Sequence, residues 1–348
     1  MKFLVAGGTG AVGRHVCQEV VRTLGPQALV VGDYKLPRAR EFARSIAESV
    51  EVAAVDVRDP DSVSRATEGV DAVIVAVRQF EALVQTVCTE RGIHSVDIVP
   101  DTPLARSVLA SELPGSGGRQ LSGVVAAGLI PGLSGLMVRQ VIEEGLDSRD
   151  IHVSLLQRKN GTAGAAGIAD MLGLFSRPVE YQERIVGGFT VRRTATFPPP
   201  FGQRSLRLVA FPEAADLRAY FKNEHIHYWT AFDEEPFNMT IGMLNRIGVL
   251  RRFREPGGGA TLAALLARGK KLPANTEESV ALIAERGETV VRLSMPSDYA
   301  GTAMAAVAMT RILVANGAPD YGVVLPFQLF TLQQVMQQIG EAAALETE

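Results

Sequence analysis

The first hundred residues alternate between short apolar runs and longer segments in which apolar residues recur every three or four positions. The short runs are rich in valine, leucine and isoleucine, which is typical of strands buried on both faces of a sheet. The longer segments have the period of an amphipathic helix. The runs cover residues 3–6, 28–33, 52–57, 72–77 and 94–98, and the helical segments cover residues 11–21, 37–49, 60–67 and 80–90. This alternation predicts an α/β fold with a Rossmann-type, doubly wound parallel sheet.

The pattern changes after a stretch rich in glycine and proline at residues 113–118. Strand-like segments then dominate, at residues 151–156, 183–193 and 205–211, with helical segments near 163–175, 237–247 and 302–316. We therefore expect a dinucleotide-binding domain at 1–125 and a substrate and dimerisation domain at 126–316. The second domain should be α+β, built on a mixed sheet, and residues 317–348 should return to the first domain.

A glycine-rich segment joins the first predicted strand to the first predicted helix. Its residues fit the G-x-G-x-x-G pattern, in which the glycines allow a tight turn, a close approach to a pyrophosphate and close packing of helix on strand. The helix N-terminus would offer N–H groups to the phosphates. The expected cofactor contacts here are Gly8, Thr9, Gly10, Ala11, Val12 and Gly13. The spacing also suits short-chain dehydrogenases, but no tyrosine is followed by lysine four residues later, which disfavours that class.

An acidic residue ends the second predicted strand, twenty residues beyond Gly13. A carboxylate at Asp33 would accept hydrogen bonds from the adenosine ribose and repel a 2′-phosphate, which favours NAD over NADP. Lys35 and Arg38 follow, and they would accept the phosphate if Asp33 turned aside. NAD is the expected cofactor, with NADP as the alternative.

Other strand ends supply the remaining expected contacts. Asp56 and Val57 end the third strand, where contacts with the adenine edge are usual. The fourth strand ends at Ala76 and Val77, beside the expected nicotinamide, followed by Arg78. We expect Arg78 to contact the cofactor and to bind a substrate carboxylate, although a solvated loop arginine is equally consistent with the pattern.

Two further segments carry candidate catalytic groups. Asp97, after the fifth strand, would hold an amine or pass a proton to an imine nitrogen, whereas Asp101 or Thr102 would simply cap the next helix. In the second region, Arg158, Lys159 and Thr162 join a strand to a helix. Cations beside a helix N-terminus suit a carboxylate ligand, and Lys159 would donate a proton if desolvated. A basic loop in water is equally consistent with the pattern.

Composition excludes several other classes. The formal net charge of −3 indicates neither nucleic acid nor an anionic membrane as a partner. Cys17 and Cys88 each lie in a predicted helix and are expected to be buried thiols, in keeping with a cytoplasmic protein. No apolar stretch is long enough to span a bilayer, and the N-terminus is itself a strand rather than a signal peptide. His225 and His227 share a strand face but have no third ligand at metal spacing, so no metal is expected.

Several motifs together resemble the saccharopine dehydrogenase-like oxidoreductases, a family that includes saccharopine reductases and carboxynorspermidine dehydrogenases. The strongest is the segment AGLIPGLS at residues 127–134, similar to the glycine-x-x-proline-glycine turn that leads into the family's second domain. Four shorter stretches agree, at residues 55–57, 92–97, 199–202 and 322–326. The chain differs from NADP-using members, which usually carry arginine after the second strand, because Asp33-Tyr34-Lys35 stands there.

The resemblance implies an NAD(P)-dependent enzyme that transfers hydride to or from a carbon–nitrogen bond. The substrate would be a carboxylated small molecule of amino-acid or polyamine type, held by Arg78 and the loop from Arg158 to Thr162. Two alternatives remain open: a reductase of a conjugated alkene or ketone, and a non-catalytic regulator that senses the dinucleotide. A homodimer is the default expectation for such a fold.

Overall fold

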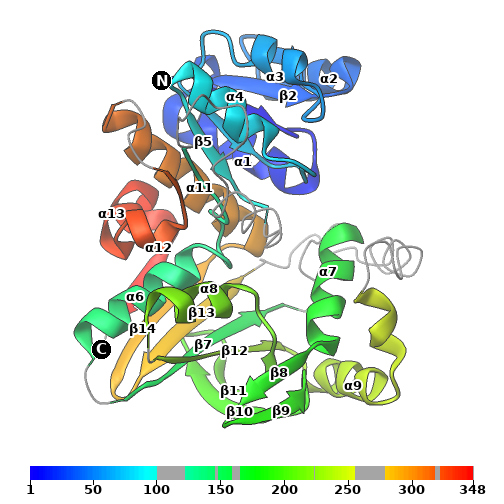
Figure 1. Cartoon of the computed structure of the whole chain (residues 1–348), viewed down its shortest axis with the longest axis vertical. Helices are drawn as coiled ribbons and strands as arrows, with labels where there is room; N and C mark the ends of the chain where they lie inside the picture. The colour runs from blue at the N-terminus through cyan, green and yellow to red at the C-terminus, as the bar shows by residue number, and fades with distance from the viewer. Residues whose placement is uncertain are drawn as a thin grey trace. The chain divides into compact units, whose positions relative to one another are not determined.

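The computed structural model describes residues 1–99, 122–145, 148–158, 165–222, 224–254, 279–317 and 322–347. The chain divides into two compact units (Figure 1). The first comprises Met1–Leu136 with Tyr299–Gly340, and the second comprises Met137–Asp298 with Glu341–Glu348. Within the described ranges, no helix has both the length and the apolar character needed to cross a membrane.

The first unit is built on a seven-stranded sheet in which every recorded pairing is parallel. Its order is β15-β6-β5-β4-β1-β2-β3, which confirms the predicted doubly wound sheet. The strands are β1 (Phe3–Ala6), β2 (Leu29–Asp33), β3 (Glu51–Ala54), β4 (Ala72–Val75), β5 (His94–Asp97), β6 (Gly123–Val124) and β15 (Val323–Val324). The third strand ends earlier than predicted because Asp56 begins a turn, in which its N–H binds Ser62 Oγ at 3.0 Å.

Helices cover both faces of this sheet. Helices α3 (Pro60–Ala66) and α4 (Leu83–Arg91) bury Val63, Ala66, Val84, Val87 and Cys88 in one apolar cluster with the strands. Helices α1 (Ala11–Leu24) and α2 (Leu36–Ile46) lie side by side, with the Arg14 guanidinium 4.3 Å from the Phe42 ring centroid. Further helices are α11 (Asp298–Ala315), α12 (Pro326–Leu329), α13 (Leu332–Ile339) and α6 (Leu133–Glu144), which runs from one unit into the other.

The second unit contains the predicted mixed sheet, in the order β10-β11-β12-β7-β13-β14-β16. Strands β7 and β12 are parallel, and the other recorded pairs are antiparallel. The strands are β7 (Asp150–Gln157), β10 (Arg192–Phe197), β11 (Gly202–Val209), β12 (His225–Phe232), β13 (Val280–Arg286), β14 (Thr289–Met295) and β16 (Ala344–Thr347). Strands β8 (Pro178–Tyr181) and β9 (Arg184–Gly187) form a separate hairpin.

The single strand predicted at residues 183–193 is wrong. The chain instead forms the end of the β8–β9 hairpin, turns, and starts β10 at Arg192. The turn includes Phe189, whose φ of +63° lies in the left-handed region and whose N–H binds Leu208 O at 2.7 Å. Alternation of side chains could not reveal this break, because the positions on both sides of it have strand-like residues.

Helices complete the second unit. Helices α8 (Glu213–Tyr220) and α9 (Glu235–Arg246) contact β12, and α7 (Ala165–Ser176) contacts the short helix η2 (Val249–Phe253). Trp229, Leu206 and Leu208 lie in an apolar cluster on one face of the sheet, packed against side chains of the β8–β9 hairpin. The neighbouring positions Arg207 of β11 and Tyr228 of β12 point to the other face, where they contact Glu235 of α9 and Glu213 of α8.

Candidate functional site

The turn between β1 and α1 is packed closely against its own backbone. Gly7 has a φ of +83°, and a Cβ atom there would lie 2.9 Å from Val77 Cβ. A Cβ on Gly13 would lie only 2.2 Å from Gly7 O, so helix and turn could not approach as they do. An added Cβ on Gly10, by contrast, would meet only Gly7 O, at 3.1 Å. Gly10 is exposed, so this part of the loop is open to a ligand.

Helix α1 presents donors beside this open part. Gly10 is its N-cap residue and has no side chain with which to cap it. The first bond closing the helix runs from Arg14 N–H to Gly10 O, at 3.0 Å. The N–H groups of Ala11, Val12 and Gly13 precede that bond and lie at the positive end of the helix dipole. Open glycine backbone next to helix N–H groups fits the pyrophosphate of a dinucleotide.

Asp33 lies at the end of β2, where the sequence placed it, and it is held firmly inside the unit. Its side chain is 2% exposed and accepts hydrogen bonds from Thr9 Oγ1 and from Lys35 N–H, the latter at 2.8 Å. Arg38 Nη2 lies 2.8 Å from Oδ1 and 2.6 Å from Oδ2. Burial alone would raise the pKa of Asp33, but these hydrogen bonds and the arginine charge outweigh it, so the pKa is lowered.

Two cations and an aromatic ring lie next to this carboxylate. Tyr34 is exposed, with Lys35 Nζ 5.3 Å and the Arg38 guanidinium 5.5 Å from its ring centroid. At the end of β3, Asp56 forms a 2.7 Å ion pair with Arg58. Hydrogen bonds from Arg58 lower the pKa of Asp56 to about 2, so the predicted adenine contact is an ionised carboxylate.

The segment after β4 lies directly beside the glycine turn. Ala76 N–H binds Ala6 O at 2.8 Å, and Val77 is the close neighbour of Gly7. The structure therefore brings together two sets of predicted cofactor residues that are about seventy positions apart in the sequence. Arg78 follows and is exposed.

Asp97 is buried at the end of β5, with an exposed fraction of 3%. Its Oδ2 accepts from Gln79 Nε2 at 2.9 Å and from Gln85 Nε2 at 3.2 Å, while its Oδ1 accepts from Val99 N–H at 2.8 Å. These bonds tie β5 to the segment that follows Arg78. Catalysis by Asp97 stays a prediction, and the alternative caps, Asp101 and Thr102, lie outside the described residues.

Two elements lie at this end of the sheet that the sequence did not predict there. The first is the turn at residues 126–132, where Ala127 N–H binds the main-chain oxygen of Asp97 at 2.9 Å. The second is the start of α11, where Thr302 Oγ1 accepts from Leu129 N–H at 3.2 Å. One turn of helix earlier, Tyr299 faces His15 of α1, with ring centroids 6.0 Å apart. In the sequence, only the family resemblance indicated the turn. No local sequence pattern predicts where α11 packs.

In the second unit, Arg158 directly follows β7. Its Nε binds Ser279 Oγ at 3.1 Å, and its guanidinium lies 5.8 Å from the Phe201 ring centroid. Arg158 is half-buried, so these contacts orient its planar group at the end of the strand. Lys159 and Thr162 lie outside the described residues, and their predicted roles stay predictions.

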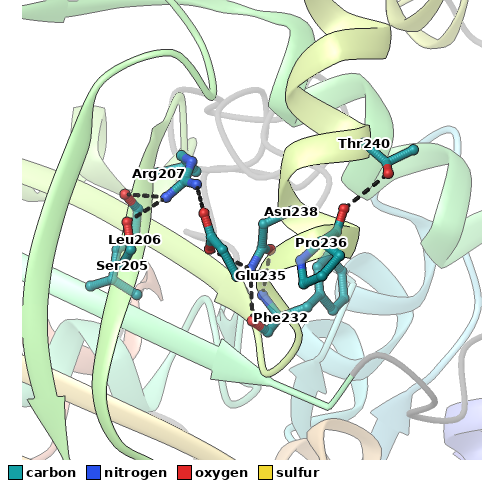
Figure 2. A network of polar contacts seen from close by, with 8 residues as sticks. All are labelled: Ser205, Leu206, Arg207, Phe232, Glu235, Pro236, Asn238 and Thr240. Atoms are coloured by element: carbon teal, nitrogen blue, oxygen red, sulfur yellow. Dashed lines mark hydrogen bonds and ion pairs between the residues drawn. The ribbon is translucent and has the colours of Figure 1, made fainter.

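A polar network that the sequence did not reveal joins β11 to α9 (Figure 2). Arg207 is 2% exposed and contacts Ser205 Oγ at 2.8 Å, and it also pairs with Glu235 at the start of α9. Asn238 accepts from Phe232 N–H and donates to Phe232 O, both at 2.8 Å. The network fixes the start of α9 against the end of β12. A lone arginine in a strand pattern gave no signal of its burial.

On β12, the strand predicted to carry two histidines, His227 and Trp229 belong to an aromatic group that includes His152 of β7, whereas the His225 side chain is exposed. His152 Nδ1 accepts from Trp229 Nε1 at 3.1 Å, and the rings of His152 and His227 are stacked 5.8 Å apart. Burial and the charge of Arg193 lower the pKa of His152 to about 4. Among the residues that the structure describes, no group of three or more His, Cys, Asp and Glu side chains could hold a metal ion.

Known proteins share both the domain type and the fold. Residues 7–114 match the model of a family described as NAD(P)H-binding, so the first unit contains a domain of this type. Saccharopine dehydrogenase (L-Glu forming) from Saccharomyces cerevisiae is similar over 100% of this chain and 99% of its own, with 13% identity and a TM-score of 0.67. Homospermidine synthase from Legionella pneumophila, solved in complex with NAD, is similar over 97% of this chain and 88% of its own, with 12% identity and a TM-score of 0.62.

No curated protein matches the chain by sequence. The chain nevertheless has the fold of the saccharopine dehydrogenase-like oxidoreductases along its whole length, which confirms the predicted resemblance at the level of the fold. At these identities the likeness speaks for the fold alone.

Proposed function

We propose that this protein is an NAD(P)-dependent oxidoreductase that acts on a carbon–nitrogen bond. The observation that carries the proposal is the open face at Gly10 beside the N-terminus of α1, in a chain with a saccharopine dehydrogenase-like fold from end to end. The substrate class is a carboxylated secondary amine of amino-acid or polyamine type. In the reverse direction, it is the imine formed by an amine and a carbonyl compound.

The cofactor contacts come from the turn and from three strand ends. We assign the pyrophosphate to the backbone from Gly8 to Gly13, the ribose end to Asp33, and the adenine edge to Asp56 and Val57. The nicotinamide end is assigned to the segment from Ala76 to Arg78. The packing of Val77 against Gly7 supports treating the turn and this segment as one binding surface.

When bound, the nicotinamide ring supplies hydride to the imine carbon or accepts it from the amine. The imine nitrogen gains a proton as the secondary amine forms, so a proton donor is needed. Asp97 and Lys159 are the candidate donors. Because both carboxyl oxygens of Asp97 are bonded to amide groups of its own unit, Lys159 is the better candidate of the two.

We assign the substrate carboxylates to Arg78 in the first unit and to Arg158, Lys159 and Thr162 in the second. The support for Arg158 is its orientation: Ser279 and Phe201 hold the side chain through Nε and one ring contact. A planar guanidinium binds a carboxylate through two parallel hydrogen bonds, and each charge-assisted bond contributes about 1.5–3 kcal/mol.

The test is turnover of NADH and NADPH with a panel of amines and oxo acids, followed by absorbance at the nicotinamide band. Steady oxidation that needs both an amine and an oxo acid supports the proposal. Oxidation with a ketone or conjugated alkene alone would assign the chain to the alternative reductase class. Nucleotide binding without turnover of any of these compounds would favour the regulator.

Once a substrate is found, Arg78→Ala and Arg158→Ala test the carboxylate contacts. Each should raise KM by roughly ten- to a hundredfold for the acid, but not for its amide. Because Arg158 is not among the assigned cofactor contacts, Arg158→Ala should also leave cofactor affinity nearly unchanged. Arg65→Ala and Arg184→Ala are matched controls, because both arginines are exposed and lie on α3 and β9 respectively. Equal effects on acid and amide would remove these arginines from the substrate site. A homodimer stays a prediction, which light scattering in solution would test.

A further inference from the structure

The carboxylate expected to read the ribose has its acceptor capacity filled by the protein itself. An ionised carboxylate offers about four lone-pair positions. At Asp33, Lys35 N–H and Arg38 Nη2 occupy Oδ1, while Thr9 Oγ1 and Arg38 Nη2 occupy Oδ2. A ribose hydroxyl would have to displace one of these donors. Arg38 is the one that can move, because its side chain is 45% exposed whereas Thr9 and the Lys35 N–H are fixed in the turn.

The same ion pair changes the charge that a nucleotide meets. Asp33 and Arg38 neutralise one another, and Lys35 adds a positive charge next to the Tyr34 ring. The guanidinium of Arg38 has five N–H donors, and only those of Nη2 are bonded to Asp33. In the part of the chain that the structure describes, its Nε and Nη1 have no hydrogen-bond acceptor. The end of β2 therefore has a net positive charge and unused guanidinium donors.

We propose that the ion pair between Arg38 and Asp33 lets this chain accept NADP(H) as well as NAD(H). With NADP(H), Arg38 keeps its bond to Asp33 and turns its remaining donors, together with Lys35, to the 2′-phosphate. With NAD(H), Arg38 swings into solvent and the ribose hydroxyls take its place on the carboxylate. The proposal rests on the proposed dinucleotide site and identifies Arg38 as the residue that sets its selectivity.

The experiment measures dissociation constants of NADH and NADPH by nicotinamide fluorescence, with no substrate present. For the natural chain, we expect the two constants to agree within about tenfold, because a gain of contacts to the phosphate offsets the lost ribose bonds. In Arg38→Gln, the Asp33 carboxylate is uncovered and the guanidinium is lost. The ratio of NADPH to NADH affinity should then fall by about ten- to a hundredfold.

A second variant separates repulsion from misfolding. Adding Asp33→Asn to Arg38→Gln removes the uncovered charge, so part of the lost NADPH affinity should return. Arg44→Gln is the matched control, because Arg44 is exposed in the last turn of the same helix, and it should leave the ratio unchanged. A larger preference of the natural chain in either direction, or an unchanged ratio in Arg38→Gln, would overturn the proposal. Failure of both nucleotides to bind the natural chain would instead refute the proposed function.

Discussion

The glycine turn allows stability and nucleotide binding to be separated with two substitutions. In Gly13→Ala, the new Cβ would lie 2.2 Å from Gly7 O and 3.0 Å from Gly8 Cα, and both neighbours are backbone. Alanine in place of glycine would by itself favour the helix by up to about 1 kcal/mol. Forcing a methyl group into a packed site costs about 1–3 kcal/mol, and the turn cannot yield without moving β1. The clash should win, with a net loss of about 1–2 kcal/mol of stability.

Gly10→Ser is the contrasting substitution, because position 10 of the same turn has room for a side chain, whereas position 13 does not. Gly10 has φ −69° and ψ 171°, the extended conformation usual for an N-cap residue, and serine is a favoured N-cap. Its hydroxyl would accept from the N–H of Val12 or Gly13, so stability should hold or rise slightly. The same hydroxyl occupies the donors and the space meant for the pyrophosphate, so nucleotide affinity should fall at least tenfold, the loss expected for about 1.4 kcal/mol.

The assay uses the position of the sole tryptophan, Trp229, in the second unit. Its fluorescence follows unfolding of that unit in urea, whereas far-ultraviolet circular dichroism follows both units. Gly13→Ala should lower the dichroism midpoint, with a melting temperature about 2–8 °C lower, and leave the tryptophan transition in place. Gly10→Ser should change neither transition and weaken only NADH binding. This account of the turn would be refuted if Gly13→Ala had the same dichroism midpoint as the natural chain. It would also be refuted if Gly10→Ser lost as much stability as Gly13→Ala.

Three further predictions address the buried polar groups. Asp97→Asn would bring the amide N–H₂ of the new asparagine against the amide N–H₂ of Gln79, which should cost about 1–3 kcal/mol of stability. Adding Gln79→Glu restores a hydrogen-bond acceptor, so it should restore the melting temperature. Burial lowers the pKa of His152 to about 4, so the unfolded chain binds the proton more readily than the folded chain. The free energy of unfolding should therefore fall by up to about 3 kcal/mol between pH 6.5 and pH 4. In urea titrations, His152→Gln should make the free energy of unfolding less dependent on pH. Arg207→Met should lower the free energy of unfolding by at most about 1 kcal/mol, because Glu235 is partly exposed and can turn to water. Arg207→Ala also leaves a cavity and should lower it by about 2–4 kcal/mol. Both losses are measured by tryptophan fluorescence during urea unfolding.

Strands β1 to β4 of the first sheet could be predicted because each is a short, mainly apolar run with a helix after it. The two-residue strands β6 and β15 are too short to give such a signal. Such runs are local signals, since burial on both faces demands continuous apolar residues. The second unit was harder to predict. Strand β9 and the start of β10 were merged into one expected strand because the turn at Phe189 depends on a hydrogen bond to Leu208, a residue far along the chain. A contact of that kind leaves no mark in the spacing of apolar side chains.

The candidate site likewise has features that the sequence predicts and features that it does not. The chemical identity of Asp33 and its place after the second strand follow from the motif, but its charge environment does not. Whether that carboxylate repels a phosphate depends on where Arg38 points, and Arg38 lies five residues on, across the turn that starts α2. The motif identifies the acid, whereas the selectivity that we propose depends on the ion pair between Arg38 and Asp33. Cofactor preference inferred from a single acidic residue is therefore incomplete until the partner of that residue is known, because pairing can cancel the repulsion on which the inference rests.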